Sequence, residues 1–171
     1  MLNIWVILAV VSFPFVGVAD VDYKATKHSK KAVPQNALYQ AECGSCHFAF
    51  QANLLPSQSW KKLMLPEALA NHFGDNAELN EQDRVALLNY LIANGADKKR
   101  RLLRYPKGAA PLRITELPYF KKEHREIPKR MVQGNPKVRS LVNCLACHTD
   151  AGKGTYRERN IRIPGYGYWD D

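Results

Sequence analysis

Apolar residues recur at helical spacing through the first half of the chain. The pattern is clearest after Asn80-Glu81-Gln82-Asp83, which resembles a capping box and predicts a helix that runs to Asn94. The apolar positions expected on one face of this helix are Val85, Leu88, Leu91 and Ile92. This segment is the most strongly patterned helix in the sequence.

Three shorter helices are expected before it. Residues 35–46 read as a helix that is capped by Asn36. Residues 59–64 and 66–73 read as two further pieces. Pro66 breaks the first of these and is tolerated at the start of the second, which Gly74 ends.

The second half of the chain has fewer apolar positions and a weaker pattern. It predicts a short helix over 119–125, an irregular stretch to Pro136, a helix from Val138 into His148, and a tail rich in Gly and Arg. No segment alternates strongly enough to predict a strand. We therefore expect a mainly α protein with much irregular structure in its second half.

An apolar run over residues 2–18 opens the chain and ends at Gly17-Val18-Ala19, a pattern of small residues that signal peptidases cleave. We predict that residues 1–19 are a signal peptide and that the protein is exported to the periplasm. No Lys or Arg precedes the apolar run, so an uncleaved membrane anchor stays an alternative. Residues 20–34 read as a basic, solvated tether.

All four cysteines lie in two copies of C-x-x-C-H, Cys43-Gly44-Ser45-Cys46-His47 and Cys144-Leu145-Ala146-Cys147-His148. Two thiols three positions apart lie on neighbouring edges of one helical turn, where each can bond one vinyl group of a haem while the next residue's imidazole reaches the iron. Cys43, Cys46, Cys144 and Cys147 are thus predicted thioether ligands of two covalent haem c groups, and His47 and His148 predicted proximal iron ligands.

Zinc and short-loop disulfides are the two alternatives for these cysteines. The pairs are about a hundred residues apart, which is long for a zinc ribbon, and zinc does not require a histidine after each pair. The repeated histidine and the export context favour haem.

Removal of 19 residues leaves 152, which is enough for one compact domain or two very small ones. Buried haem supplies the apolar nucleus that such small units lack. We predict two cytochrome c-like haem domains, residues 35–97 and 113–171, joined by a basic linker over 98–112.

Each haem has one well-placed candidate for its sixth iron ligand. His72 lies 25 residues after His47. His124 lies 24 residues before His148. Two imidazoles on each iron give low-spin centres of low potential that pass electrons and do little else.

Other side chains compete less well for these positions. His28 lies among lysines of the tether and is expected to be solvated. Met64 sits between two leucines and is expected in the core, so Met131 is the stronger rival. Which histidine serves which haem stays open.

Several interspersed motifs resemble the bacterial dihaem cytochrome c family over nearly the whole mature chain. They are Ala41-Glu42-Cys43-Gly44-Ser45-Cys46-His47, Leu54-Leu55-Pro56, Ser59-Trp60, His72-Phe73-Gly74-Asp75-Asn76-Ala77, Arg113-Ile114-Thr115, Glu123-His124-Arg125, and Asn143-Cys144 with Cys147-His148. The resemblance implies a periplasmic two-domain protein whose two haems have His72 and His124 as distal ligands. It also implies electron exchange with a small oxygen-binding monohaem cytochrome c or a membrane cytochrome b.

We expect an electron carrier rather than an enzyme, because a haem enzyme needs an iron with an open or displaceable position and this chain has a histidine available for each iron. The alternative is a haem enzyme or gas-binding sensor with one open iron. If His124 were not a ligand, the second haem would be five-coordinate.

Charge is divided unevenly along the chain. Residues 20–97 carry 7 Lys or Arg against 9 Asp or Glu, a net −2, whereas residues 98–171 carry 18 against 7, a net +11. We expect an acidic partner surface to dock on the second half, guided by residues 98–107, Lys121, Lys122, Lys129 and Arg130. The alternative is that these cations only solubilise the domain. No nucleic-acid partner is expected, since no aromatic-basic motif is present.

Overall fold

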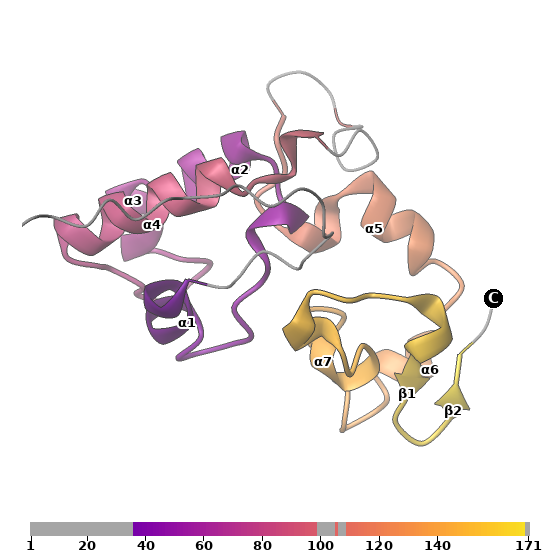
Figure 1. Ribbon diagram of the computed structural model, residues 1–171. Helices are drawn as coiled ribbons and strands as arrows, with labels where there is room; N and C mark the ends of the chain where they lie inside the picture. The colour runs from indigo at the N-terminus through magenta and orange to yellow at the C-terminus, as the bar shows by residue number, and fades with distance from the viewer. Residues whose placement is uncertain (1–35, 99–104, 106–108, 170–171) are drawn as a thin grey trace, which may run out of the picture. The chain divides into compact units, whose positions relative to one another are not determined.

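Helices and irregular segments make up nearly all of the described chain, residues 36–98, 105 and 109–169, in the computed structural model (Figure 1). The mainly α expectation is confirmed. The predicted signal peptide, the tether with His28, and most of the linker over 98–112 lie outside the described residues. None of the described helices is long and apolar enough to span a bilayer.

Four α-helices and two 3₁₀ turns form residues 36–98, the described part of the first half. The helices are α1 Ala37–Cys43, α2 Ser57–Leu63, α3 Pro66–Ala70 and α4 Glu81–Ala93. The turns are η1 Ala52–Leu54 and η2 Ala96–Lys98.

Local chemistry sets the starts of these helices as the sequence predicts. The Asn36 side chain accepts hydrogen bonds from the backbone N–H groups of Leu38 and Tyr39, which caps α1. Asn80 accepts from the Asp83 backbone N–H at 2.9 Å and caps α4. Pro66 occupies the first turn of α3, where its missing N–H costs no hydrogen bond.

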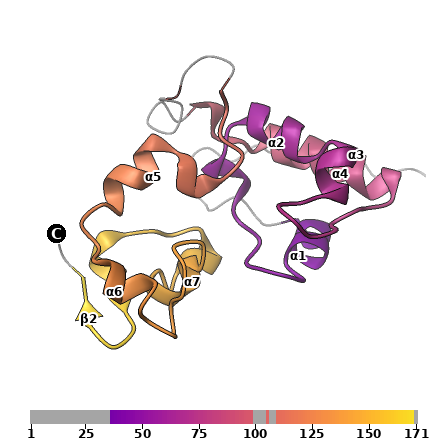
Figure 2. The same cartoon turned by 180° about the vertical axis from the view of Figure 1, so that it is seen from behind.

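The hydrophobic core lies between α4 and the elements that precede it. Leu87 and Leu91 of α4 are fully buried, and α4 lies beside α2 in both views (Figure 1, Figure 2). Trp60 of α2 donates from its indole to the Ala52 carbonyl at 2.7 Å. Met64 is buried in the same cluster, as expected. The prediction that Val85 faces the core was wrong, since it is 40% exposed and Leu87 takes that role.

The described part of the second half contains three short α-helices, α5 Pro118–Glu123, α6 Lys129–Val132 and α7 Cys144–Cys147. Its 3₁₀ turns are η3 Ile114–Glu116, η4 Ala151–Lys153 and η5 Glu158–Asn160. Leu117, between η3 and α5, is fully buried in the core of the first half. The described residues belong to one compact unit, and its division into two haem domains stays a prediction.

Several boundaries in the second half differ from the expectations. α6 lies within the stretch that was expected to be irregular. The helix expected from Val138 shrinks to α7, because Arg139 has a φ of 65° and the chain turns back there. Buried Asn135 stabilises this loop by donating to the Pro164 carbonyl at 2.7 Å and accepting from the Lys137 backbone N–H.

Two minimal strands, β1 Arg162–Ile163 and β2 Gly167–Tyr168, close the described chain. They pair antiparallel, with Arg162 opposite Tyr168 and Ile163 opposite Gly167. The sequence analysis expected no strand, and two residues are too few to produce a visible alternation.

Candidate haem-binding sites

The first C-x-x-C-H motif begins at the last residue of α1. Cys43 ends the helix, and residues 44–46 form a turn that carries Cys46 to the surface. The helix expected to continue to residue 46 therefore stops three residues early. The Ser45 hydroxyl donates to the Glu42 carbonyl at 2.9 Å, a local bond that stabilises the turn instead of another helical residue.

His72 faces the histidine of this first motif. The ring centres of His47 and His72 are 6.4 Å apart, and their planes are inclined by 17°. His72 lies in a tight turn after α3, where its backbone N–H donates to the Asp75 carbonyl at 2.7 Å. Phe73 and Gly74 both have positive φ values in this turn, a backbone shape that glycine adopts without strain.

The second motif forms one helical turn, α7, with both cysteines on it and His148 directly after it. His124, at the end of α5, faces His148 with ring centres 6.1 Å apart and planes inclined by 66°. Phe120 lies one turn before His124 and stacks on its ring at 3.9 Å. The structure thus places each motif histidine opposite the candidate ligand nearest to it in the sequence, a pairing that the sequence left open.

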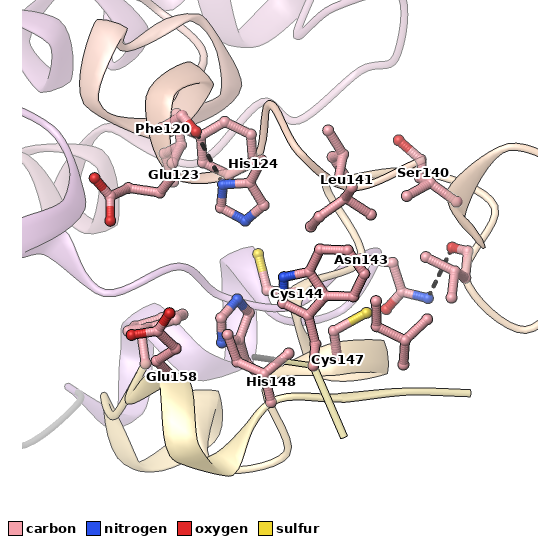
Figure 3. Close-up of a pocket in the computed structure, with 18 of the residues that line it drawn as sticks. Phe120, Glu123, His124, Ser140, Leu141, Asn143, Cys144, Cys147, His148 and Glu158 are labelled. Atoms are coloured by element: carbon pink, nitrogen blue, oxygen red, sulfur yellow. Dashed lines mark hydrogen bonds between the residues drawn. The ribbon is translucent and has the colours of Figure 1, made fainter. Parts of the chain in front are cut away.

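A cavity of about 560 Å³ lies at the second site, between α5, α7 and the chain that follows α7. Figure 3 shows His124 and His148 on opposite sides of it, with the thiols of Cys144 and Cys147 beside the space between the rings. Most of the remaining wall is apolar, with contributions from Ile114, Leu117, Phe120, Ile127, Val132, Val138, Leu141, Ile161, Ile163 and Trp169. An apolar slot with a few converging polar groups suits a flat, largely hydrophobic ligand.

Burial favours the neutral form of one histidine in each pair, His72 and His148. Desolvation lowers the pKa of His72, and the nearby charges of His47 and Arg113 lower it further. Desolvation also lowers the pKa of His148, with a smaller contribution from His124. A neutral imidazole is the form that binds a metal.

One histidine of each pair has its Nδ1 atom engaged by a backbone carbonyl. His47 Nδ1 lies 2.8 Å from the Phe48 carbonyl oxygen, and His124 Nδ1 lies 2.9 Å from that of Phe120. As donors in these bonds, both rings leave Nε2 for a metal. On the opposite rings, the Nδ1 atoms of His72 and His148 are buried with no hydrogen-bond partner among the described residues.

These distances fit an iron between the rings of each pair. Metal–imidazole bonds of about 2 Å place the centres of two rings on opposite sides of one ion roughly 6 Å apart. The observed 6.4 and 6.1 Å agree with this span. The residues of both sites, two thiols beside two facing imidazoles, therefore fit covalently bound haem.

The alternatives for the cysteines find no support in the described chain. All four thiols are free, so neither motif forms a disulfide. No cluster of three or more His, Cys, Asp or Glu side chains suited to a metal ion occurs within residues 36–98, 105 and 109–169. Burial raises the pKa of Cys43 and of Cys144 to about 11.

Sequence reasoning missed several neighbours of these histidines. The Tyr156 ring packs edge-on against His148 at 5.4 Å, and Arg113 lies 3.8 Å over the Phe73 ring beside His72. Arg113 and Phe73 lie in motifs that the sequence analysis noted, but nothing in the sequence shows that they meet, and Tyr156 lies in no motif. Of the aromatic residues near the C-terminus, Trp169 lines the cavity, whereas Tyr168 is 66% exposed.

Comparisons with known proteins agree on one family. The family model described as dihaem cytochrome c matches residues 39–156. A dihaem cytochrome c structure from Shewanella baltica is 45% identical, with a TM-score of 0.68, and covers 81% of this chain and 100% of its own. One from Rhodobacter sphaeroides is 44% identical, with a TM-score of 0.65, and covers 72% of this chain and 98% of its own.

Among curated proteins, no relative matches this sequence. The family match spans more than half of the chain, and both solved relatives exceed 40% identity over most of it. The chain therefore belongs to the dihaem cytochrome c family and is a haem electron-transfer protein with two covalently bound haem c groups.

Proposed function

We propose that this protein is a periplasmic electron carrier, not an enzyme, and that both of its haem irons are six-coordinate. Cys43 and Cys46 attach the first haem, whose iron His47 and His72 ligate. Cys144 and Cys147 attach the second, whose iron His148 and His124 ligate. The apolar run over residues 2–18 supports export.

One observation carries this proposal. Each motif histidine faces a second histidine, with ring centres 6.4 Å apart in one pair and 6.1 Å in the other, so both imidazoles of a pair would bind one iron. Two strong ligands fill an iron, so no position is left for a substrate or a gas. Electron transfer is the chemistry that a filled iron performs.

When bound, haem supplies the one-electron ferric/ferrous couple, and the chain's own residues tune it. The Phe48 and Phe120 carbonyls orient His47 and His124 and increase the basicity of the imidazoles by accepting from Nδ1. The apolar wall of the cavity excludes water from the second site. Both features would hold the two histidines in place when haem is bound.

The proposed partner is a small oxygen-binding monohaem cytochrome c or a membrane cytochrome b with an acidic docking surface. The basic second half supports this assignment, and Lys121, Lys122, Lys129 and Arg130 are exposed in the structure. The proposed docking face therefore surrounds α5 and α6, next to the second haem site.

Carbon monoxide separates the carrier from the alternatives. Added to the fully reduced holoprotein, it should leave the visible spectrum unchanged, because neither iron has an open position. Binding of one equivalent would instead identify a haem enzyme or gas sensor, and would reject the carrier proposal. A haem protein with an open ferrous iron, such as a globin, is the positive control.

A further inference from the structure

Gln51 is a buried polar residue that the haem sites do not use directly. Its side chain comes from the segment between His47 and η1 and is only 6% exposed. Both ends of its amide are nevertheless engaged by residues about a hundred positions away. Gln51 Nε2 donates to the Ala151 carbonyl at 2.5 Å, and the Tyr156 hydroxyl donates to Gln51 Oε1.

Gln51 belongs to a segment that is held next to the first haem site. Phe50, the preceding residue, has its ring 5.3 Å from that of His47. The Phe50 carbonyl accepts a hydrogen bond from the buried Tyr39 hydroxyl at 2.7 Å, which holds the segment against α1. Gln51 thus has a fixed place relative to the first iron-ligating histidine.

The two groups that form hydrogen bonds with Gln51 both contact His148 of the second haem site. Ala151 is fully buried, and its backbone N–H donates to the His148 carbonyl at 2.9 Å. Tyr156 packs its ring against the His148 ring at 5.4 Å. A single amide therefore joins the segment that follows the first motif to the segment that follows the second.

We propose that Gln51 is a positioning residue that fixes the separation of the two haems. Glutamine suits this place because its amide offers a donor and an acceptor together, and it meets one carbonyl and one hydroxyl here. Glutamate could not donate to Ala151, and an apolar residue would satisfy neither group. A fixed separation matters to a two-haem carrier because the rate of electron tunnelling falls steeply with distance.

The inference takes one thing from the proposed function, namely that both irons are ligated. The spectrum of the parent protein tests this point separately. The test variant is Gln51→Met, which keeps the length of the side chain and removes both hydrogen bonds. Gln40→Met is the matched control, since Gln40 Nε2 is buried without a hydrogen-bond partner among the described residues. Both are made in the full holoprotein.

The measurement is pulsed dipolar electron paramagnetic resonance (EPR) between the two ferric irons, with hydrogen exchange of the backbone amides of 151–155. Gln51→Met should broaden the distribution of inter-iron distances and exchange these amides about tenfold faster. Gln40→Met should match the parent in both. A parent-like distance distribution in Gln51→Met would overturn the proposal, whatever the change in overall stability.

Tyr156→Phe decides the question if Gln51→Met does not fold. It keeps the ring against His148 and removes only the hydroxyl that donates to Gln51. A broader distance distribution with unchanged low-spin signals is expected. A distribution as narrow as that of the parent contradicts a positioning role for this hydrogen bond.

Discussion

The two pairs of facing histidines differ in the orientation of their rings. The planes of His47 and His72 are nearly parallel, at 17°, whereas those of His124 and His148 are strongly crossed, at 66°. Two parallel imidazole rings both interact with the same one of two iron d orbitals, which separates the two orbitals in energy. Two crossed rings interact with one orbital each, so the two orbitals stay nearly equal in energy. The two ferric haems should therefore be spectroscopically distinct although the ligands proposed for them are the same.

Phe120 holds the crossed orientation of the second pair. Its ring stacks on that of His124 at 3.9 Å with only 12° between the planes. Phe120→Leu removes this stacking and keeps the hydrogen bond from His124 to the backbone carbonyl, so the orientation of the imidazole should be less fixed. We predict that the EPR signal with the larger anisotropy, from the second haem, shifts or broadens in this variant. The signal of the first haem serves as the internal control. Equal changes in both signals would contradict the assignment.

The buried Tyr39 hydroxyl contributes to the stability of the first half. Burial raises its pKa far above the ordinary value, and the hydroxyl donates to the Phe50 carbonyl at 2.7 Å. Tyr39→Phe should lower the free energy of unfolding by about 1 kcal/mol, because the carbonyl loses its partner in a buried place. Chemical denaturation of the holoprotein measures this.

The exposed Tyr168 provides the comparison for that variant. Its hydroxyl accepts from Arg162 at the surface, where water can replace the bond. Tyr168→Phe should change the free energy of unfolding by less than about 0.5 kcal/mol. If Tyr168→Phe lowered the free energy of unfolding as much as Tyr39→Phe does, burial of the hydroxyl would not be the cause of the loss in Tyr39→Phe.

Helix starts were the most predictable elements of the fold. Asn36, Pro66 and Asn80 act through bonds or exclusions within three residues, so their effect can be read from local sequence. Helix ends were less predictable. α1 stops at Cys43 because the next turn bonds locally, and a helical pattern does not exclude that competition.

Asn36 provides a direct test of the capping of α1. Asn36→Ala removes the acceptor for two backbone N–H groups and should lower the free energy of unfolding by about 1 kcal/mol. Asn36→Asp keeps an acceptor and should retain most of the stability. Denaturant titrations of both variants measure the difference. Equal stabilities for the two would contradict the capping role.

The segment before α7 shows where sequence patterning fails. Val138 is buried and was expected to begin a helix, but Arg139 takes a left-handed conformation instead. Asn135 stabilises this left-handed loop by donating a hydrogen bond to the Pro164 carbonyl, 29 residues later in the chain. A contact over such a separation leaves no periodic signal, so only the fold reveals it.

The same reasoning explains which parts of the haem sites were predictable. The C-x-x-C-H spacing identifies the motif cysteines and histidines. His72 and His124 were predicted because the sequence has few other side chains that could be the sixth ligand of each iron. Gln51 and Tyr156 could not be found in this way. They meet only because the fold brings two segments together from opposite halves of the described chain.

The charge difference between the halves predicts how the proposed partner docks. Electron transfer to an acidic partner should slow as ionic strength rises, because salt screens the attraction that guides association. The double variant Lys121→Glu and Lys129→Glu should lower the bimolecular rate constant about tenfold at low salt. Stopped-flow mixing with the partner measures both effects.

Lys61→Glu is the control for these variants, because Lys61 is an exposed cation of α2 in the less basic half. It should affect the rate constant far less than the double variant does. A rate independent of ionic strength, or an equal loss in Lys61→Glu, would reject docking on the second half.

The ligation of both irons is tested most directly by the ferric EPR spectra of His72→Ala and His124→Ala beside that of the parent holoprotein. The parent should show two low-spin signals and no high-spin signal. Each variant should keep both thioether-bound haems, lose one low-spin signal and gain a high-spin one, with a different signal lost in each. A high-spin haem in the parent, or a variant that retains both low-spin signals, would contradict the assignment of these four histidines.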